Sequence, residues 1–206
     1  SKTGLADIFN NVIVRGGTQA LSPKELAQVL DENAIQLGVS VDEEQTAVRL
    51  SVMKADWEKG LSLLQAVLTR PGFDPAVLQV AKNQEIVSLK RQGGDAMSVA
   101  MRESKIWHFK DHPYGRDPLA GLQTIRNISS EDLKQFLKTY IVPENMTIAI
   151  AGDIDKAQIV TGLNRFLKAF PKTPAPRRDL KDPAATAPVL LLVDKPGQVQ
   201  SQVILS

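Results

Sequence analysis

The order of helix and strand signals is the feature that most restricts the fold of this chain. Helix start signals recur along the sequence, and the clearest is Ser22-Pro23-Lys24-Glu25. It offers a capping serine, a proline at the first helical position and a glutamate that completes a capping box. Few stretches show the alternation of apolar and polar residues that is typical of a strand. These stretches do not follow the helices in a regular order along the chain. Runs of helices between pairs of strands predict an α+β fold.

Helices are predicted where apolar residues recur at helical spacing behind a start signal. They run over residues 5–14, 22–37, 56–70, 74–91, 129–140 and 155–170, with a further segment ending near 109. Strands are predicted over residues 38–42, 47–53, 146–151, 189–193 and 199–205.

The same pattern predicts how the chain is divided. Residues 1–170 should form one α+β domain, and residues 171–188, rich in proline and charge, should form a linker. Residues 189–206 carry two predicted strands beyond the linker, and the family resemblance given below implies that they are the first strands of a following domain. The sequence begins at a helix with no strand before it and ends inside an apolar strand, so we expect a fragment.

Composition excludes several classes of function. A net charge of +2, from 25 basic and 23 acidic residues, gives no reason to expect nucleic acid as a partner. The absence of cysteine excludes disulfides, thiolate metal sites and cysteine nucleophiles. No apolar run approaches the roughly 20 residues that span a bilayer.

Both histidines lie in the stretch HFKDH, residues 108–112, which resembles the H-x-x-E-H zinc motif with an aspartate for the glutamate. On one helix, His108 and His112 would share a face. Pro113 disfavours helical geometry at His112, however, and Asp111 is one methylene too short. We interpret the stretch as a helix end and a turn, with zinc binding as the alternative.

Five stretches resemble the insulinase/pitrilysin-type zinc peptidases, a family that includes mitochondrial processing peptidase. They are GLADIFNNVIVRGGT, SPKELAQVLDENAIQLGVSV, RPGFDPAVLQVAKNQEIV, DHPYGRDPLAGLQTIRNISSEDLKQFLKTYIVPENMTIAIAGDID and VDKPGQVQSQVIL. The resemblance implies helices packed on a mostly antiparallel sheet. It also implies a catalytic and an inactive half that face each other across a chamber enclosing unfolded peptide.

The resemblance places the family's H-x-x-E-H motif on the first helix, where this chain has Asp7-Ile8-Phe9-Asn10-Asn11. Asp7 and Asn11 then replace the two histidine ligands, and Asn10 replaces the catalytic glutamate. The glutamates of the long helix correspond to Asn83 and Lys90, so a cation stands where the third ligand would be. A shift of one residue would place Ile8, Asn11 and Val12 at the motif, which suits zinc no better.

These replacements predict no catalytic residue and no metal ligand in this chain, with zinc expected only in a catalytic partner. We also predict that Lys90 approaches the face of the first helix that carries Asp7 and Asn11, and substitutes there for the metal cation.

The function implied is an inactive homologue that acts as the partner half of a peptide-degrading or processing chamber. The candidate for peptide contact is the strand residues Val39, Ser40, Val41 and Asp42, through strand addition. Here the family's N-A-x-T-like stretch reads Ser40-Val41-Asp42-Glu43, so an ordinary hairpin strand is the alternative. Two other functions stay open: an active zinc metalloendopeptidase that relies on a partner's metal site, and a structural scaffold subunit.

The expected partners are a catalytic zinc-peptidase subunit or domain and extended peptides. Exposed sheet edges also favour association of the chain with itself, as a homo-oligomer. We expect no membrane span, and a periplasmic or exported bacterial location, from the cysteine-free composition and the family's habit.

Overall fold

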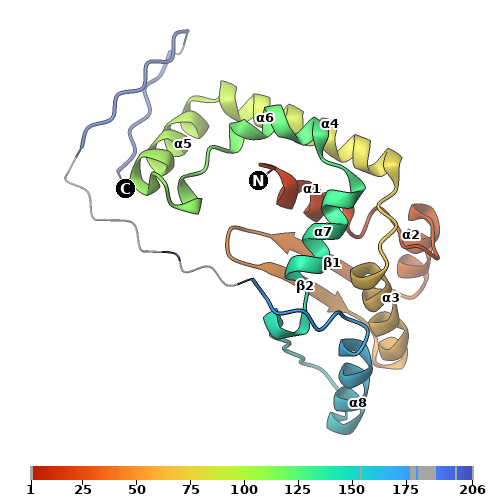
Figure 1. The fold of residues 1–206 in the computed structure, drawn as a ribbon. Coiled ribbons are helices and arrows are strands. Elements are labelled where there is room, and N and C mark those ends of the chain that lie inside the picture. Colours follow the sequence, from red (N-terminus) through yellow and green to blue (C-terminus); the bar gives the residue numbers. More distant parts are fainter. Residues whose placement is uncertain (1, 154, 177–179, 181–188, 198, 206) are drawn as a thin grey trace. The chain divides into compact units, whose positions relative to one another are not determined.

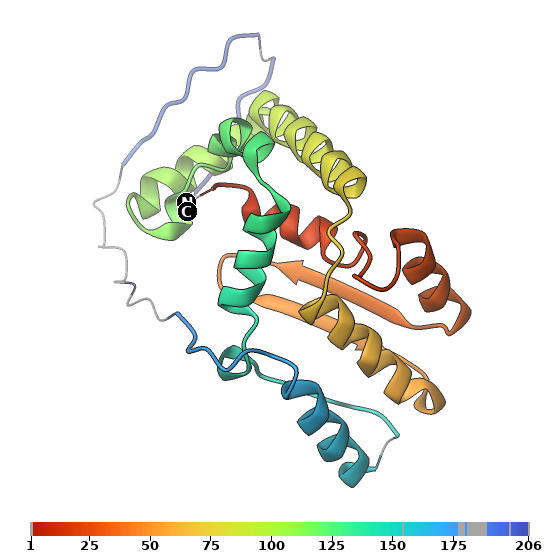
Figure 2. The ribbon, with the colours of Figure 1, turned by 45° about the vertical axis from the view of Figure 1, so that its right-hand side comes forward.

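A computed structural model describes residues 2–153, 155–176, 180, 189–197 and 199–205 (Figures 1 and 2). The chain divides into two compact units, and each is described by itself. One, here the hairpin unit, comprises residues 5–81 and 128–177. The other, here the α5 unit, comprises residues 1–4, 82–127 and 178–206.

Helices dominate both units. The elements that begin in the hairpin unit are α1 (Leu5–Val12), α2 (Pro23–Glu32), β1 (Gln36–Val41), β2 (Thr46–Ser51), η1 (Lys54–Asp56), α3 (Trp57–Thr69), α4 (Pro75–Gly94), α7 (Ser130–Tyr140), η5 (Pro143–Asn145) and α8 (Lys156–Leu167). Helix α4 continues into the α5 unit, which also holds α5 (Ala96–Phe109), η2 (Pro113–Gly115), η3 (Pro118–Ala120), α6 (Gly121–Thr124) and η4 (Ile125–Asn127).

Strands β1 and β2 form an antiparallel hairpin in which Val39 faces Val48 and Leu37 faces Leu50. These four apolar residues are half-buried, and the residues that alternate with them are exposed. Helices α1 and α2 contact β1, and α3 contacts β2. Leu50 and Val52 lie directly against Gly60 of α3, where an added Cβ would approach Val52 to 3.1 Å. One face of the hairpin is therefore covered by helices.

The core of the hairpin unit is built around α1. Ile8, Phe9 and Val12 are fully buried, as their helical spacing requires. The ring of Phe9 lies 6.3 Å from that of Phe73 and 4.8 Å from that of Phe136 on α7, measured between ring centroids. This packing fixes which face of α1 is left for polar residues.

Local helix signals are confirmed at most positions. Ser22 forms the predicted capping box with Glu25, and Ser129 forms one with Asp132. Asp155 caps α8 through the backbone N–H groups of Ala157 and Gln158. Asp56, the first residue of the helix predicted over residues 56–70, makes no capping hydrogen bond with its side chain and closes the short helix η1 instead, so that α3 begins at Trp57.

The predicted strands over residues 146–151, 189–193 and 199–205 are wrong for this structure. Within the described part of the chain, the only strand ladder is the one between β1 and β2. Most apolar residues of the last two segments are exposed, Val199 completely, whereas Ile204 is half-buried. A strand needs a neighbour that pairs its backbone groups, and no neighbour for these segments occurs among the described residues. The α+β class is confirmed, as a mostly helical fold with a two-stranded antiparallel sheet.

The predicted helix over residues 22–37 is shorter than expected. Helix α2 ends at Glu32, followed by Asn33 and then by Ala34 with a positive φ of 49°. Such a residue cannot continue a right-handed helix. The predicted division into residues 1–170, 171–188 and 189–206 stays a prediction, and most of residues 177–188 lie outside the described part.

Candidate functional site

The face of α1 opposite the core carries the residues that the resemblance predicts at the zinc-motif positions. Asp7 is exposed, and Asn10 and Asn11 are half-buried. The burial of Ile8, Phe9 and Val12 forces these three side chains away from the core. The predicted motif positions on this helix are therefore brought together on one face.

Asn10 has an unusual environment for a polar residue. Its Oδ1 atom is buried and accepts no hydrogen bond from the residues that the structure describes. Leaving a buried acceptor without a donor is costly, so the Asn10 Oδ1 atom needs a donor that the described residues do not supply. An amide has no titratable proton near neutral pH and cannot act as the general base that a glutamate supplies.

The carboxyl of Asp7 is also perturbed. Burial raises its pKa above the ordinary value of 3.8, and the negative charge of Glu43 raises it further. A backbone hydrogen bond at Asp7 itself acts in the opposite direction and does not cancel the effect. The residue is exposed by surface area, but protein atoms still displace enough water around the carboxyl to disfavour its charge.

These residues do not fit a zinc ion. Zinc in peptidases is held by imidazoles and carboxylates, and α1 offers one carboxylate and two amides. Among the described residues, no group of three or more histidine, cysteine, aspartate or glutamate side chains is placed to hold a metal. Lys90 is exposed on α4 and belongs to the α5 unit, whereas Asp7 belongs to the hairpin unit, so the approach of Lys90 to Asp7 stays a prediction.

The HFKDH stretch does not place its histidines on one helical face. His108 lies on the last turn of α5, which ends at Phe109. Lys110 then takes φ 44° and ψ −114°, and His112 has the extended values −68° and 147°. The prediction that Pro113 would keep His112 out of the helix is confirmed. The Nδ1 atom of His112 accepts a hydrogen bond from the backbone N–H of Tyr114 at 3.2 Å.

The candidate peptide-binding residues lie on β1 and in the turn after it. Asp42 closes that turn, because its Oδ1 accepts hydrogen bonds from the N–H groups of Glu44 and Gln45 at 2.8 and 2.7 Å. These bonds lower the pKa of Asp42. Its carboxylate is therefore engaged in the hairpin itself, unlike the three residues before it.

The hairpin ladder determines which backbone groups of β1 point away from β2. The N–H of Asp42 donates to the carbonyl of Gln45 at 3.0 Å. Inward and outward backbone groups alternate along an antiparallel strand, so Ser40 bonds across to β2 while Val39 and Val41 direct their N–H and C=O groups outward. In the described part of the chain, no strand pairs with this outer edge of β1.

Glu43 is a residue near the candidate site that the sequence reasoning used only as part of a motif comparison. Its charge acts on Asp7 although 36 positions separate them, because the hairpin returns toward α1. The acidic run Asp42-Glu43-Glu44 in a tight turn was the available signal.

Comparisons with known proteins agree with the sequence resemblance. Residues 127–206 match the family described as the peptidase M16 inactive domain. The non-peptidase homolog YmxG of Helicobacter pylori is 26% identical over 172 residues, covering 84% of this chain and 40% of that protein. The chain spans well under half the length of the curated relatives that it matches first, between 32 and 40%.

Solved structures show the same fold. A peptidase M16 inactive domain from Pseudomonas fluorescens superposes with a TM-score of 0.80 at 22% identity, covering 89% of this chain and 45% of that one. The periplasmic protease PqqL of Escherichia coli gives a TM-score of 0.72 at 17% identity, covering 89% of this chain and 20% of that one. The chain is therefore similar in sequence and fold to proteins of the M16 type, and its residues 127–206 match the family description of the inactive domain.

Proposed function

We propose that this chain is the non-catalytic half of an M16-type chamber, where it binds extended peptide segments along the outer edge of β1. The observation that carries the proposal is this edge. Val39 and Val41 offer their backbone groups outward without a strand partner in the described part of the chain. Strand addition uses main-chain hydrogen bonds and gives affinity with little sequence preference.

The α1 face supports the non-catalytic part of the proposal. It has an amide at the position of the catalytic glutamate and no imidazole, so zinc and the catalytic base are expected in a partner subunit or domain. The relation to YmxG, whose name describes a non-peptidase, points in the same direction. The peptidase partner would provide the chemistry, and this chain would provide part of the peptide-binding wall.

A proline substitution on the strand edge tests peptide binding. Val39→Pro removes an outward N–H group, whereas the control variant Val39→Ala changes the same side chain and keeps the N–H group. We expect unstructured fluorescent peptides to bind wild type and V39A with comparable affinity in an anisotropy titration. V39P should bind at least about tenfold more weakly, the equivalent of roughly 1.4 kcal/mol.

Two outcomes of this titration would contradict the proposal. Equal binding of V39P and V39A, in variants whose circular dichroism matches wild type, would remove the β1 edge as the site. No binding of any peptide by wild type, alone or mixed with a zinc-bearing M16 peptidase, would contradict the chamber role and favour a structural scaffold.

We also propose a periplasmic or exported location. One structural relative is a periplasmic protease, and this chain has no cysteine. None of the described helices is long and apolar enough to cross a membrane. Fractionation of cells that express the full-length protein tests the location, and recovery with cytoplasmic markers would contradict it.

A further inference from the structure

We propose that the junction between α4 and α5 is a docking site for a segment of this same chain, the turn over residues 194–197, and that Lys195 is the residue it binds. The contact between Lys195 and the junction, here the latch, holds the apolar segments 189–193 and 199–205 to the α5 unit. Any strand that pairs with these segments then meets them beside α5. The latch is independent of peptide binding at β1, and its residues all belong to the α5 unit.

Burial around the turn is the reverse of what the residue types predict. Lys195 is half-buried, whereas the leucines and valines of the two flanking segments are exposed, and five of them exceed 80% exposure. Lysine is among the residues that proteins bury least, and leucine and valine are among those they bury most. A segment that buries its lysine and exposes its leucines is held in place through the lysine.

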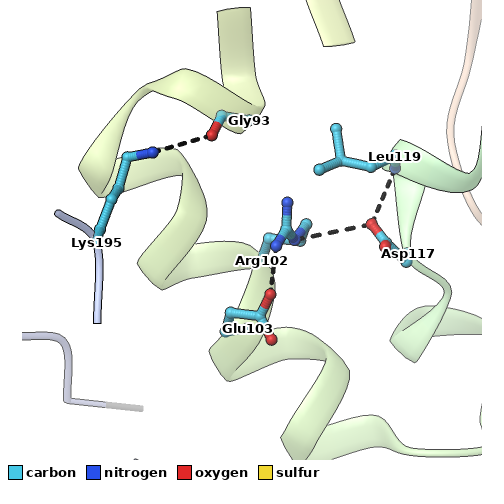
Figure 3. A network of polar contacts seen from close by, with 6 residues as sticks. All are labelled: Gly93, Arg102, Glu103, Asp117, Leu119 and Lys195. Atoms are coloured by element: carbon cyan, nitrogen blue, oxygen red, sulfur yellow. Dashed lines mark hydrogen bonds and ion pairs between the residues drawn. The ribbon is translucent and has the colours of Figure 1, made fainter. Parts of the chain in front are cut away.

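The Lys195 side chain reaches the last turn of α4 (Figure 3). Its Nζ donates a hydrogen bond to the carbonyl oxygen of Gly93 at 3.2 Å, although 102 positions separate the two residues. Helix α4 ends at Gly94, and the last four carbonyls of a helix have no partner within the helix. These carbonyls also carry partial negative charge, so an ammonium is a favourable donor at this end of α4.

Asp95 places a second negative group at the junction. It caps α5, where its carboxylate accepts a hydrogen bond from the Ser98 N–H at 2.7 Å. The hydrogen bonds with Ser98 are the main cause that lowers the pKa of Asp95, and the positive charge of Lys195 lowers it further. Lys195 is therefore attracted by the ionised carboxylate at the start of α5 while it binds the Gly93 carbonyl at the end of α4.

Glycines on both sides suit this contact. A Cβ added at Gly94 would have no atom within 4 Å, so the surface next to Gly93 is open. In the turn itself, Gly197 has a φ of 82°, in the left-handed region that favours glycine. The chain can therefore turn directly after Lys195 and present its side chain to the junction.

Paramagnetic NMR on the full chain tests the latch, because a chain without cysteine accepts a spin label at one engineered position. Met97→Cys places the label on the first turn of α5, at a side chain that is 45% exposed and takes no part in the latch. The readout is the loss of amide signal from residues 194, 195 and 197, relative to the same sample after the label is reduced.

We expect the spin label to broaden these signals when Lys195 is present, and we expect Lys195→Met to abolish the broadening. Lys195→Arg should keep it, because a guanidinium also donates to carbonyls at the end of a helix. Lys90→Met is the matched control, since it removes the same charge from an exposed residue of α4. It should leave the broadening unchanged.

A mixed sample identifies the occupant of the junction. Isotope-labelled chain without a spin label is combined with spin-labelled chain of natural isotope content, and we expect no broadening. Broadening in this sample would overturn the proposal, because the turn would then dock on a second copy of the chain. The proposal is also overturned if the spin label broadens none of these signals, if K195M and K195R give the same result, or if K90M abolishes the broadening.

Discussion

At the scale of single residues, Asp7 connects the predicted position of the zinc motif to the stability of the fold. Its pKa is raised in the folded chain, chiefly by burial and then by Glu43. The folded state therefore binds the Asp7 proton more tightly than the unfolded state does. The ionised carboxyl costs stability at neutral pH, and this cost falls as the pH drops through the folded-state pKa. It is absent below the unfolded value near 3.8.

We accordingly expect Asp7→Asn to raise the free energy of unfolding at pH 7. The gain over wild type should shrink as the pH is lowered and vanish near pH 3, because both proteins are then neutral at this position. Urea unfolding at a series of pH values measures it. Glu43→Gln is the matched control and should give a smaller gain, since Glu43 is the lesser of the two causes.

A decrease in the free energy of unfolding on Asp7→Asn would be equally informative. If D7N destabilises the chain at pH 7, the ionised Asp7 has a favourable partner, as predicted for Lys90. A double-mutant cycle of D7N with Lys90→Met would then measure the coupling between the two residues.

At the scale of helices and strands, local signals were the most successful guides. The capping boxes at Ser22 and Ser129 were predictable, because each depends on residues three positions apart in the sequence. The extended segment over residues 146–151 was not, because a strand is defined by a partner that the local sequence does not contain. Its apolar pattern favours a strand, but no ladder forms for it among the described residues.

Some features of the candidate site could likewise be predicted from the sequence, and others could not. That Asp7, Asn10 and Asn11 share a face of α1 follows from helical spacing, and the burial of Ile8 and Phe9 confirms it. The buried oxygen of Asn10 and the effect of Glu43 on Asp7 depend on how the hairpin packs near α1. Such contacts between distant segments have no local signature.

Two adjacent serines allow a direct test of the cap on α7. The Ser129 hydroxyl accepts a hydrogen bond from the Asp132 N–H at 3.2 Å, whereas Ser130 is the first residue of the helix. We expect Ser129→Ala to lower the free energy of unfolding by about 1 kcal/mol. Ser130→Ala should change it by less than about 0.5 kcal/mol, because alanine suits the helix. Equal effects in thermal or urea unfolding would contradict the assigned cap.

At the scale of the whole molecule, the chain combines a fold shared with M16-type structures and a first helix that carries Asp7, Asn10 and Asn11 where the resemblance predicts the metal motif. It spans 40% of YmxG, so the chamber, the peptidase partner and any strands that pair with residues 146–151 are properties proposed for a longer assembly. The apolar segments over residues 189–193 and 199–205 expose side chains that a larger assembly could cover.

Zinc stoichiometry tests the central claim most directly. Tag-free protein is incubated with zinc, desalted and measured by elemental analysis. Because α1 offers one carboxylate and two amides where two histidines and a glutamate are needed, we predict a value near zero per chain. A value near one per chain would contradict the non-catalytic assignment, and His108→Ala would then show whether HFKDH is the site.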